Sequence, residues 1–281
     1  MTQVQRNEAY FRTEVDKTEL DRLVSGARLF DPHARDGLSR VGLRRGDKVI
    51  DVGCGPIGAL LVLADLVGPE GTVVGLDMDA PSLQRARAIL DQIGQAHVQL
   101  INANINEMLP TAVCPPGPFD AAFCRQLLNN QQDPAATLRR IAAIVRPGGH
   151  IVVHSPLFFD PLPQSEPALP ALSVIMQWFG QVMRRKGAAP EVAGQYHALC
   201  QEVGLTEVSQ RGFFVAGAAE AGILISYMSD AVGGIRPVLV QSGIASEREV
   251  DGVLRQLHEA ATWGFQVFYA VMHVELIAQV P

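Results

Sequence analysis

KVIDVGCGPIGALLVLADLVG, residues 48–68, is the stretch that decides the predicted fold. Apolar and β-branched residues lead into three closely spaced glycines, Gly53, Gly55 and Gly58, and a long apolar segment follows them. Glycines in the order G-x-G-x-x-G allow a tight turn between a strand and a helix, and they let a ligand approach the backbone closely. The stretch therefore predicts a strand over 49–52, a helix over 57–67 and a ligand at the turn between them.

The alternation of strand and helix continues beyond this stretch. Strands are expected at 71–77, 97–102, 119–124 and 150–155, and helices at 82–93 and 135–145. Alternating β and α segments imply right-handed crossovers and a parallel sheet with helices on both faces. The strands are nearly all apolar, as strands buried on both faces should be. With 281 residues, of which 48% are hydrophobic, the chain suits one large α/β domain.

The rest of the chain surrounds this core. We expect a helical N-terminal cap at 1–45 and a core at 46–281, with insertions at about 156–187 and 218–262. A sixth strand is expected at 206–217, and one last strand at 265–280. Because the insertions follow the fifth and sixth strands, we expect them to overhang the open end of the sheet as a lid.

Two aspartates indicate the kind of ligand. Asp77 ends the second strand, 19 residues past Gly58, where a carboxylate can accept hydrogen bonds from ribose hydroxyls. A glycine loop and a spaced acid fit both NAD and S-adenosylmethionine. Asp51 favours the second, because an acid beside the loop would repel a pyrophosphate and attract an ammonium group.

Five segments together carry a family resemblance. VIDVGCGPIG, VVGLDMD, INANI, FDAAFCRQLL and LRRIAAIVRPGGHIVV resemble the class I S-adenosylmethionine-dependent methyltransferases, over roughly residues 40–155. The resemblance implies a Rossmann-like, doubly wound, seven-stranded sheet that is mostly parallel, with an antiparallel last strand, N-terminal helices and helical lid insertions. The last apolar segment of the chain suits that antiparallel strand.

The resemblance also implies a set of cofactor contacts. Asp51, Gly53 and Gly55 would line the methionine end, and Arg125 would lie by the methionine moiety. Asp77 would bind the ribose and Met78 would flank the adenine. Asn104 and Ile105 would contact the adenine edge and face; Asn104 stands where the family commonly has aspartate.

Candidate catalytic and substrate residues are fewer. His154 ends the fifth strand at the carboxyl edge, where α/β ligands bind, so it is the candidate general base; a satisfied histidine at the strand end is the alternative. His33, Trp178 and Tyr227 are candidate substrate contacts. The alternatives are a helix-start role, which we favour for His33, core packing, which we favour for Trp178, and a dimer interface or core packing for Tyr227. No metal-ligand spacing stands out, and no metal site is predicted.

Charge and composition narrow the function. The formal charge of −6 argues against a nucleic-acid partner, and the Asn-Pro-Pro-aromatic signature that holds a flipped base is absent after the fourth strand. No uncharged apolar run reaches the length of a membrane span. We expect a cytoplasmic enzyme with a small, rather apolar substrate, and a homodimer is a candidate assembly.

The function predicted from these observations is methyl transfer from S-adenosylmethionine to an oxygen or nitrogen nucleophile of a small metabolite. Three alternatives stay open. A short-chain dehydrogenase needs Tyr-x-x-x-Lys, and none of Lys17, Lys48 and Lys186 follows a tyrosine at that spacing. The same fold and cofactor could serve a cyclisation or rearrangement, or a non-catalytic ligand-binding subunit.

Overall fold

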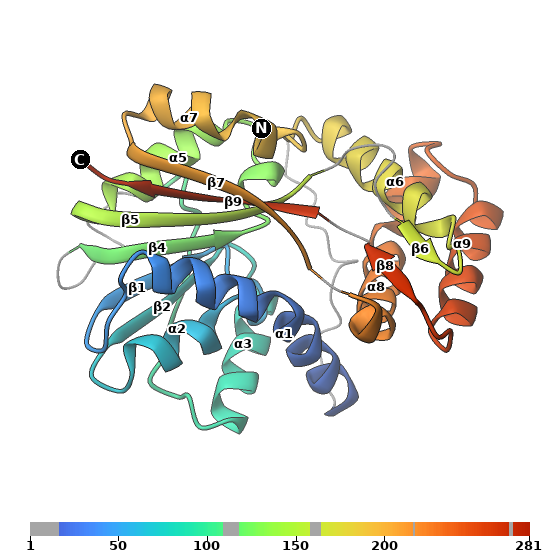
Figure 1. Ribbon diagram of the computed structural model, residues 1–281, viewed down its shortest axis with the longest axis horizontal. Coiled ribbons are helices and arrows are strands. Elements are labelled where there is room, and N and C mark those ends of the chain that lie inside the picture. Colours follow the sequence, from blue (N-terminus) through green and yellow to red (C-terminus); the bar gives the residue numbers. More distant parts are fainter. Residues whose placement is uncertain (1–16, 109–117, 158–163, 216, 270–271) are drawn as a thin grey trace.

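A seven-stranded sheet forms the centre of the protein in a computed structural model, which describes residues 17–108, 118–157, 164–215, 217–269 and 272–281. The strands lie in the order β3-β2-β1-β4-β5-β9-β7 (Figure 1). Their bounds are β1 Lys48–Val52, β2 Thr72–Asp77, β3 Gln99–Asn102, β4 Phe119–Arg125, β5 Val145–Pro156, β7 Thr206–Phe214 and β9 Met272–Gln279.

Strand direction agrees with the predicted fold class. The pairs β3–β2, β2–β1, β1–β4 and β4–β5 are parallel, and β9 is antiparallel to both β5 and β7. The chain therefore reaches β7 at the sheet edge first and then inserts its last strand between β5 and β7. This confirms the mostly parallel sheet with one antiparallel strand.

In the described part of the chain, five helices cover the two faces of the sheet. On one face lie α1 (Lys17–Arg40), α2 (Leu60–Val67) and α3 (Ala80–Gln92), which bury their apolar residues in one core cluster with Val49 and Phe123. On the other face lie α5 (Pro134–Ala143) and α7 (Tyr196–Val203), which pack on the opposite side chains of the same strands. Successive residues of a strand point to opposite faces, so each of these apolar strands supplies both cores.

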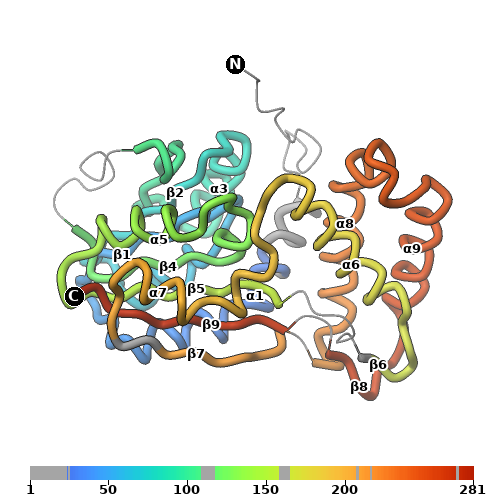
Figure 2. Tube along the Cα trace, turned by 90° about the horizontal axis from the view of Figure 1, so that it is seen from above, coloured from blue at the N-terminus to red at the C-terminus, as the bar shows by residue number. Residues whose placement is uncertain are grey.

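A helical lobe lies beyond the carboxyl ends of the parallel strands (Figures 1 and 2). It consists of α6 (Ala171–Arg185), α8 (Ala221–Gln241), α9 (Glu247–Ala260) and a two-stranded sheet of β6 (Gln164–Glu166) and β8 (Val267–Tyr269). The lobe has its own core, to which Leu29 and Phe30 of α1 also contribute. Because the segments after β5 and β7 build it, the lobe stands where the sequence places the lid insertions.

Three of the differences from the sequence-based expectations are large or have a clear physical cause. The segment expected as one last strand contains two strands, β8 and β9, which belong to different sheets. The helix expected from Ile57 begins at Leu60, because Gly58 adopts a φ of 49°, outside the helical region. The fifth strand begins at Val145, where a helix end was expected.

One helical segment of the described chain, Ala218–Gln241, has the length and composition that a membrane crossing requires. About a third of it is buried inside the protein, where α8 packs in the core of the lobe. A core helix meets the same criteria.

Candidate active site

The glycine loop connects the carboxyl ends of β1 and β2. The backbone N–H groups of Gly53 and Cys54 both donate to the carbonyl oxygen of Leu76, at 2.7 and 3.1 Å. The Asp77 carboxylate accepts from the Gly55 N–H and from the Asp79 N–H, each at 2.8 Å. Asp77 therefore holds the loop in shape as well as standing at the position predicted for ribose binding, and partial burial raises its pKa.

Asp51 lies under this loop and is almost fully enclosed. One carboxylate oxygen accepts from the backbone N–H of Ala59 at 2.7 Å, at the start of α2. Burial raises the pKa of Asp51 to about 6, although the Ala59 N–H and Arg125 oppose that shift. A buried carboxylate with so little compensation favours a cation beside it. A Cβ on Gly58 would overlap with the Asp51 carboxylate, so only glycine fits above it.

Arg125 joins the end of β4 to the glycine loop and to α1. Its Nη2 donates to the carbonyl oxygen of Gly58 at 2.8 Å, and its guanidinium lies 4.6 Å from the centre of the Phe30 ring. The other terminal nitrogen, Nη1, is enclosed and has no hydrogen-bond partner among the described residues. One buried donor of Arg125 is thus left for a ligand anion beside Asp51.

The predicted adenine contacts lie at the ends of β2 and β3. Met78 is 64% exposed, which is unusual for so apolar a side chain, whereas Ile105 is buried in the core. Asn104 accepts from the Asn106 N–H and donates to Glu107, at 3.0 and 2.9 Å, so it shapes its own turn. The exposed Met78 offers an apolar surface to a ligand, while Asn104 and Ile105 as adenine contacts stay predictions.

His154 lies in a buried network rather than at an open surface. Its Nε2 is 2.9 Å from the Oε2 of Glu275, its direct neighbour on β9, and neither side chain is more than 1% exposed. Phe123 and Phe213 pack edge-on against the imidazole. Burial, followed by the positive charge of Arg125, holds the pKa of His154 well below its usual range. His154 is neutral at pH 7, and an acceptor would reach it only after a rearrangement.

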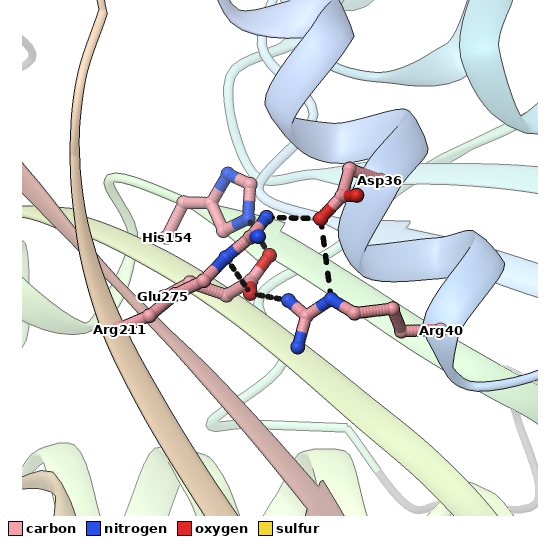
Figure 3. Close-up of polar contacts among 5 residues, drawn as sticks. All are labelled: Asp36, Arg40, His154, Arg211 and Glu275. Carbon is pink, nitrogen blue, oxygen red and sulfur yellow. Dashed lines mark hydrogen bonds and ion pairs between the residues drawn. The ribbon is translucent and has the colours of Figure 1, made fainter.

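Glu275 is the centre of this network (Figure 3). Its Oε1 forms ion pairs with Arg40 of α1 and Arg211 of β7, the second at 2.8 Å. Both arginines also bind Asp36 of α1. The network therefore fastens the second half of α1 to the strands β5, β9 and β7.

The three candidate substrate residues occupy different positions. Tyr227 of α8 packs on α1 beside Gly26, its ring 6.1 Å from that of Phe30, and its electrostatic effect reaches Arg125. His33 stacks on Phe213, with the ring centres 4.1 Å apart, and Trp178 lies inside the lobe core with 6% exposure. Tyr227 is the one of the three that the structure brings beside Arg125; the substrate roles of all three stay predictions.

Sequence analysis missed two contributors at this edge. Phe30, which supports Arg125, lies on α1 and gives no motif of its own. Glu275 could have been suspected, because it is a charged residue within the apolar final segment VMHVELIAQV. A charged side chain in a buried strand needs a polar partner. His154, in the equally apolar segment HIVVHS, is the partner that the structure shows.

The comparisons with known proteins agree with this geometry. A family model described as "Methyltransferase domain" matches residues 43–192, more than half of the chain. The ubiquinone biosynthesis O-methyltransferase of Thiobacillus denitrificans is 36% identical over 107 residues, which is 38% of this chain and 43% of that relative. The chain thus aligns with less than half the length of this curated relative.

Two solved structures have the same fold at low sequence identity. A sarcosine dimethylglycine methyltransferase from Galdieria sulphuraria gives a TM-score of 0.57 at 15% identity and covers 96% of this chain and 92% of its own. The [4+2]-cyclase SpnF gives 0.54 at 18% identity, with coverages of 89% and 81%. With the family model matched across β1 to β5, the chain belongs to the methyltransferase-domain family, within the class I S-adenosylmethionine-dependent methyltransferases.

Proposed function

We propose that this protein transfers the methyl group of S-adenosylmethionine to an oxygen or nitrogen nucleophile of a small, rather apolar metabolite. The observation that carries the proposal is the pair of opposite, incompletely compensated charges at the carboxyl ends of β1 and β4. Among the described residues, Asp51 is a buried carboxylate that accepts from one backbone N–H, and Arg125 has an enclosed Nη1 without a hydrogen-bond partner. An amino-acid zwitterion complements both.

The other cofactor contacts follow from this placement. Asp77 at the loop edge would accept from the ribose hydroxyls, while Met78 would cover one face of the adenine. Gly55 has open space where a side chain would stand, so the backbone itself can meet the ligand. A pyrophosphate in the same place would lie against Asp51, which is why NAD fits less well.

Bound there, S-adenosylmethionine supplies a methyl group on positively charged sulfur. The protein must then exclude water and align the acceptor with that methyl group. The lobe of α6, α8 and α9 faces this edge of the sheet (Figure 1). The Phe30 ring lies beside the Arg125 guanidinium, and Tyr227 packs against Phe30. These aromatic rings support an acceptor with an apolar body.

A general base is a separate part of the proposal. His154 has an Nδ1 without a hydrogen-bond partner, and Glu275 holds the opposite nitrogen. We expect His154→Ala to retain cofactor affinity and to lower turnover if this nitrogen receives the acceptor proton. Unchanged turnover in the folded variant would remove His154 from that role.

A cytoplasmic location and a homodimer also stay predictions.

Mass spectrometry of the purified protein tests the function. The protein is denatured, and the small molecules it releases are identified. S-Adenosylmethionine or S-adenosylhomocysteine would support the proposal, and NAD would overturn it.

Calorimetry with S-adenosylhomocysteine and with methylthioadenosine, which lacks the amino-acid part, then tests the charge pair of Asp51 and Arg125. Arg125→Met should lower the affinity for S-adenosylhomocysteine and leave the affinity for methylthioadenosine unchanged. Equal losses of affinity for both ligands would contradict the placement of Arg125 at the methionine end.

A second experiment distinguishes methyl transfer from a cyclisation or rearrangement with the same bound cofactor. Loaded protein is incubated with candidate acceptors, and S-adenosylhomocysteine release is measured beside acceptor consumption. Consumption without that release would replace methyl transfer with a non-methylating reaction.

A further inference from the structure

Gln126 has an unusual backbone conformation. Among the described residues it is the one non-glycine residue with a positive φ, at 55°. For a residue with a Cβ this left-handed conformation is strained, whereas a glycine adopts it without strain. Strained residues of this kind concentrate at ligand sites, where the side chain is needed in one direction.

Hydrogen bonds fix Gln126 at the carboxyl edge of the sheet. Its N–H donates to the carbonyl oxygen of His154 at 2.8 Å, and its own carbonyl accepts from Asn130 Nδ2 at 2.6 Å. The residues on each side touch the glycine loop, since Arg125 binds the Gly58 carbonyl and Leu127 packs against Gly53. Gln126 is therefore one residue away from the proposed methionine end of the cofactor.

The side chain of Gln126 is only partly buried, and one end of it is anchored. Its Nε2 lies 3.4 Å from Nε2 of His273 at the start of β9. None of the described residues hydrogen-bonds to its Oε1. His273 in turn packs edge-on to Phe30, at 5.4 Å, and Phe30 packs edge-on to Tyr227. The carboxamide of Gln126 thus lies beside a group of aromatic rings, of which Phe30 and His273 are buried and Tyr227 is partly exposed.

We propose that Gln126 binds the hydroxyl group of an aromatic methyl acceptor, with Oε1 accepting the O–H and the acceptor ring packing near Phe30 and Tyr227. The inference rests on the proposed function and narrows its substrate class to phenol-type compounds. A neutral carboxamide orients the hydroxyl and does not take its proton. The anchored Nε2 leaves Oε1 as the atom that recognises the acceptor.

A matched pair of probes tests this assignment. 1-Naphthol and 1-methoxynaphthalene, which lacks the O–H, are titrated by calorimetry into protein saturated with S-adenosylhomocysteine. We expect the wild-type protein to bind 1-naphthol about fivefold more tightly, the worth of one neutral hydrogen bond. Gln126→Met keeps the size and the strain but removes the carboxamide, so it should abolish this preference and leave the affinity for 1-methoxynaphthalene unchanged.

A second variant separates strain from recognition. Gln126→Gly should raise the thermal midpoint, because glycine adopts the positive φ without strain, and it should also lose the preference for 1-naphthol. The inference is overturned if the preference survives in Gln126→Met, if neither probe binds the saturated wild-type protein, or if Gln126→Gly lowers the midpoint. Failure of the wild-type protein to bind S-adenosylhomocysteine would instead contradict the proposed function.

Discussion

Asp51 and Glu275 are both buried carboxylates on the same face of one sheet, yet their surroundings differ. Asp51, on β1, has one backbone N–H donor, and its pKa is raised to about 6. Glu275, on β9, has two arginines and a histidine around it. The first carboxylate still favours an incoming cation, whereas the second already has its partners.

This difference separates the proposed binding site at Asp51 from a structural joint, the network of Glu275 with Arg40, Arg211 and His154. Each carboxylate lies beneath a glycine whose Cβ would overlap with it, Gly58 above Asp51 and Gly37 above Glu275. Both places are crowded, but Gly58 also lies against the Cys54 backbone and has a φ of 49°. The two places differ further in charge compensation. A compensated buried charge fixes α1 on the sheet, and an uncompensated one costs free energy until a ligand arrives.

The largest expected effect concerns the joint. Glu275→Ala should lower the free energy of unfolding by about 3–5 kcal/mol, because Arg40, Arg211 and His154 lose their common partner. Urea denaturation measures the loss. The fraction that stays folded should bind S-adenosylhomocysteine with wild-type affinity, and a large loss of that affinity would mean that the joint also belongs to the site.

The two glycines sharpen the comparison directly. Gly58→Ala and Gly37→Ala introduce the same methyl group against the two carboxylates, and each should cost about 1–3 kcal/mol of stability through overpacking. Gly58→Ala should cost more than Gly37→Ala, because the backbone at Gly58 also has a positive φ of 49°. Calorimetry of the folded variants should show lost cofactor binding for Gly58→Ala and retained binding for Gly37→Ala. If the two variants lose cofactor affinity equally, the division into site and joint is wrong.

Asp77 gives a smaller effect on binding. Asp77→Ala should weaken the binding of S-adenosylhomocysteine by about 1–3 kcal/mol. The variant loses the hydrogen bonds to the ribose, and the Gly55 N–H loses the carboxylate that holds the loop. Asp77→Asn is the control, since it keeps one acceptor oxygen. Unchanged affinity in the alanine variant would contradict the placement of the ribose.

The pH dependence of binding is the smallest effect and tests Asp51 itself. Its folded pKa of about 6 lies above the ordinary 3.8, so the unliganded protein keeps a proton that the unfolded chain has lost between these values. The stability of the unliganded protein should therefore fall as the pH rises from 3.8 to about 6.

Cofactor binding should show the opposite slope, because an ammonium group favours the ionised carboxylate. Affinity for S-adenosylhomocysteine should rise about tenfold between pH 5 and pH 7, as the carboxylate becomes fully ionised. Calorimetry at several pH values measures the slope, and Asp51→Asn should flatten it. A slope that persists in that variant would assign the titration to another group.

Much of the cofactor half could be predicted from the sequence. Gly53, Gly55, Gly58 and Asp77 are close in the chain or follow from strand ends, and parallel strands bring their carboxyl ends to one edge. The conformation of this half is local, so a motif describes it. The start of α2 was misplaced by three residues, because Gly58 could continue a helix by composition but has a positive φ in the structure.

The opposite half could not be predicted in the same way. The split of the last segment into β8 and β9 depends on two different partner strands, β6 and β5, which periodicity does not identify. The network at Glu275 joins α1, β5, β7 and β9, which lie up to 235 residues apart in the chain. His154 was noticed as a histidine at a strand end, but its neighbour across the sheet decided its environment.

The sequence by itself determined the order of strands and helices from β1 to β5, the glycine loop and the position of Asp77, because each follows from local periodicity or short spacing. Only the tertiary structure decided which buried charges are compensated, since compensation depends on side chains that distant segments bring within about 3 Å. Asp51 and Glu275 look alike in the sequence, as single acids in apolar strands. Packing of α1 and β7 against β9 supplied arginines to one of them and not to the other.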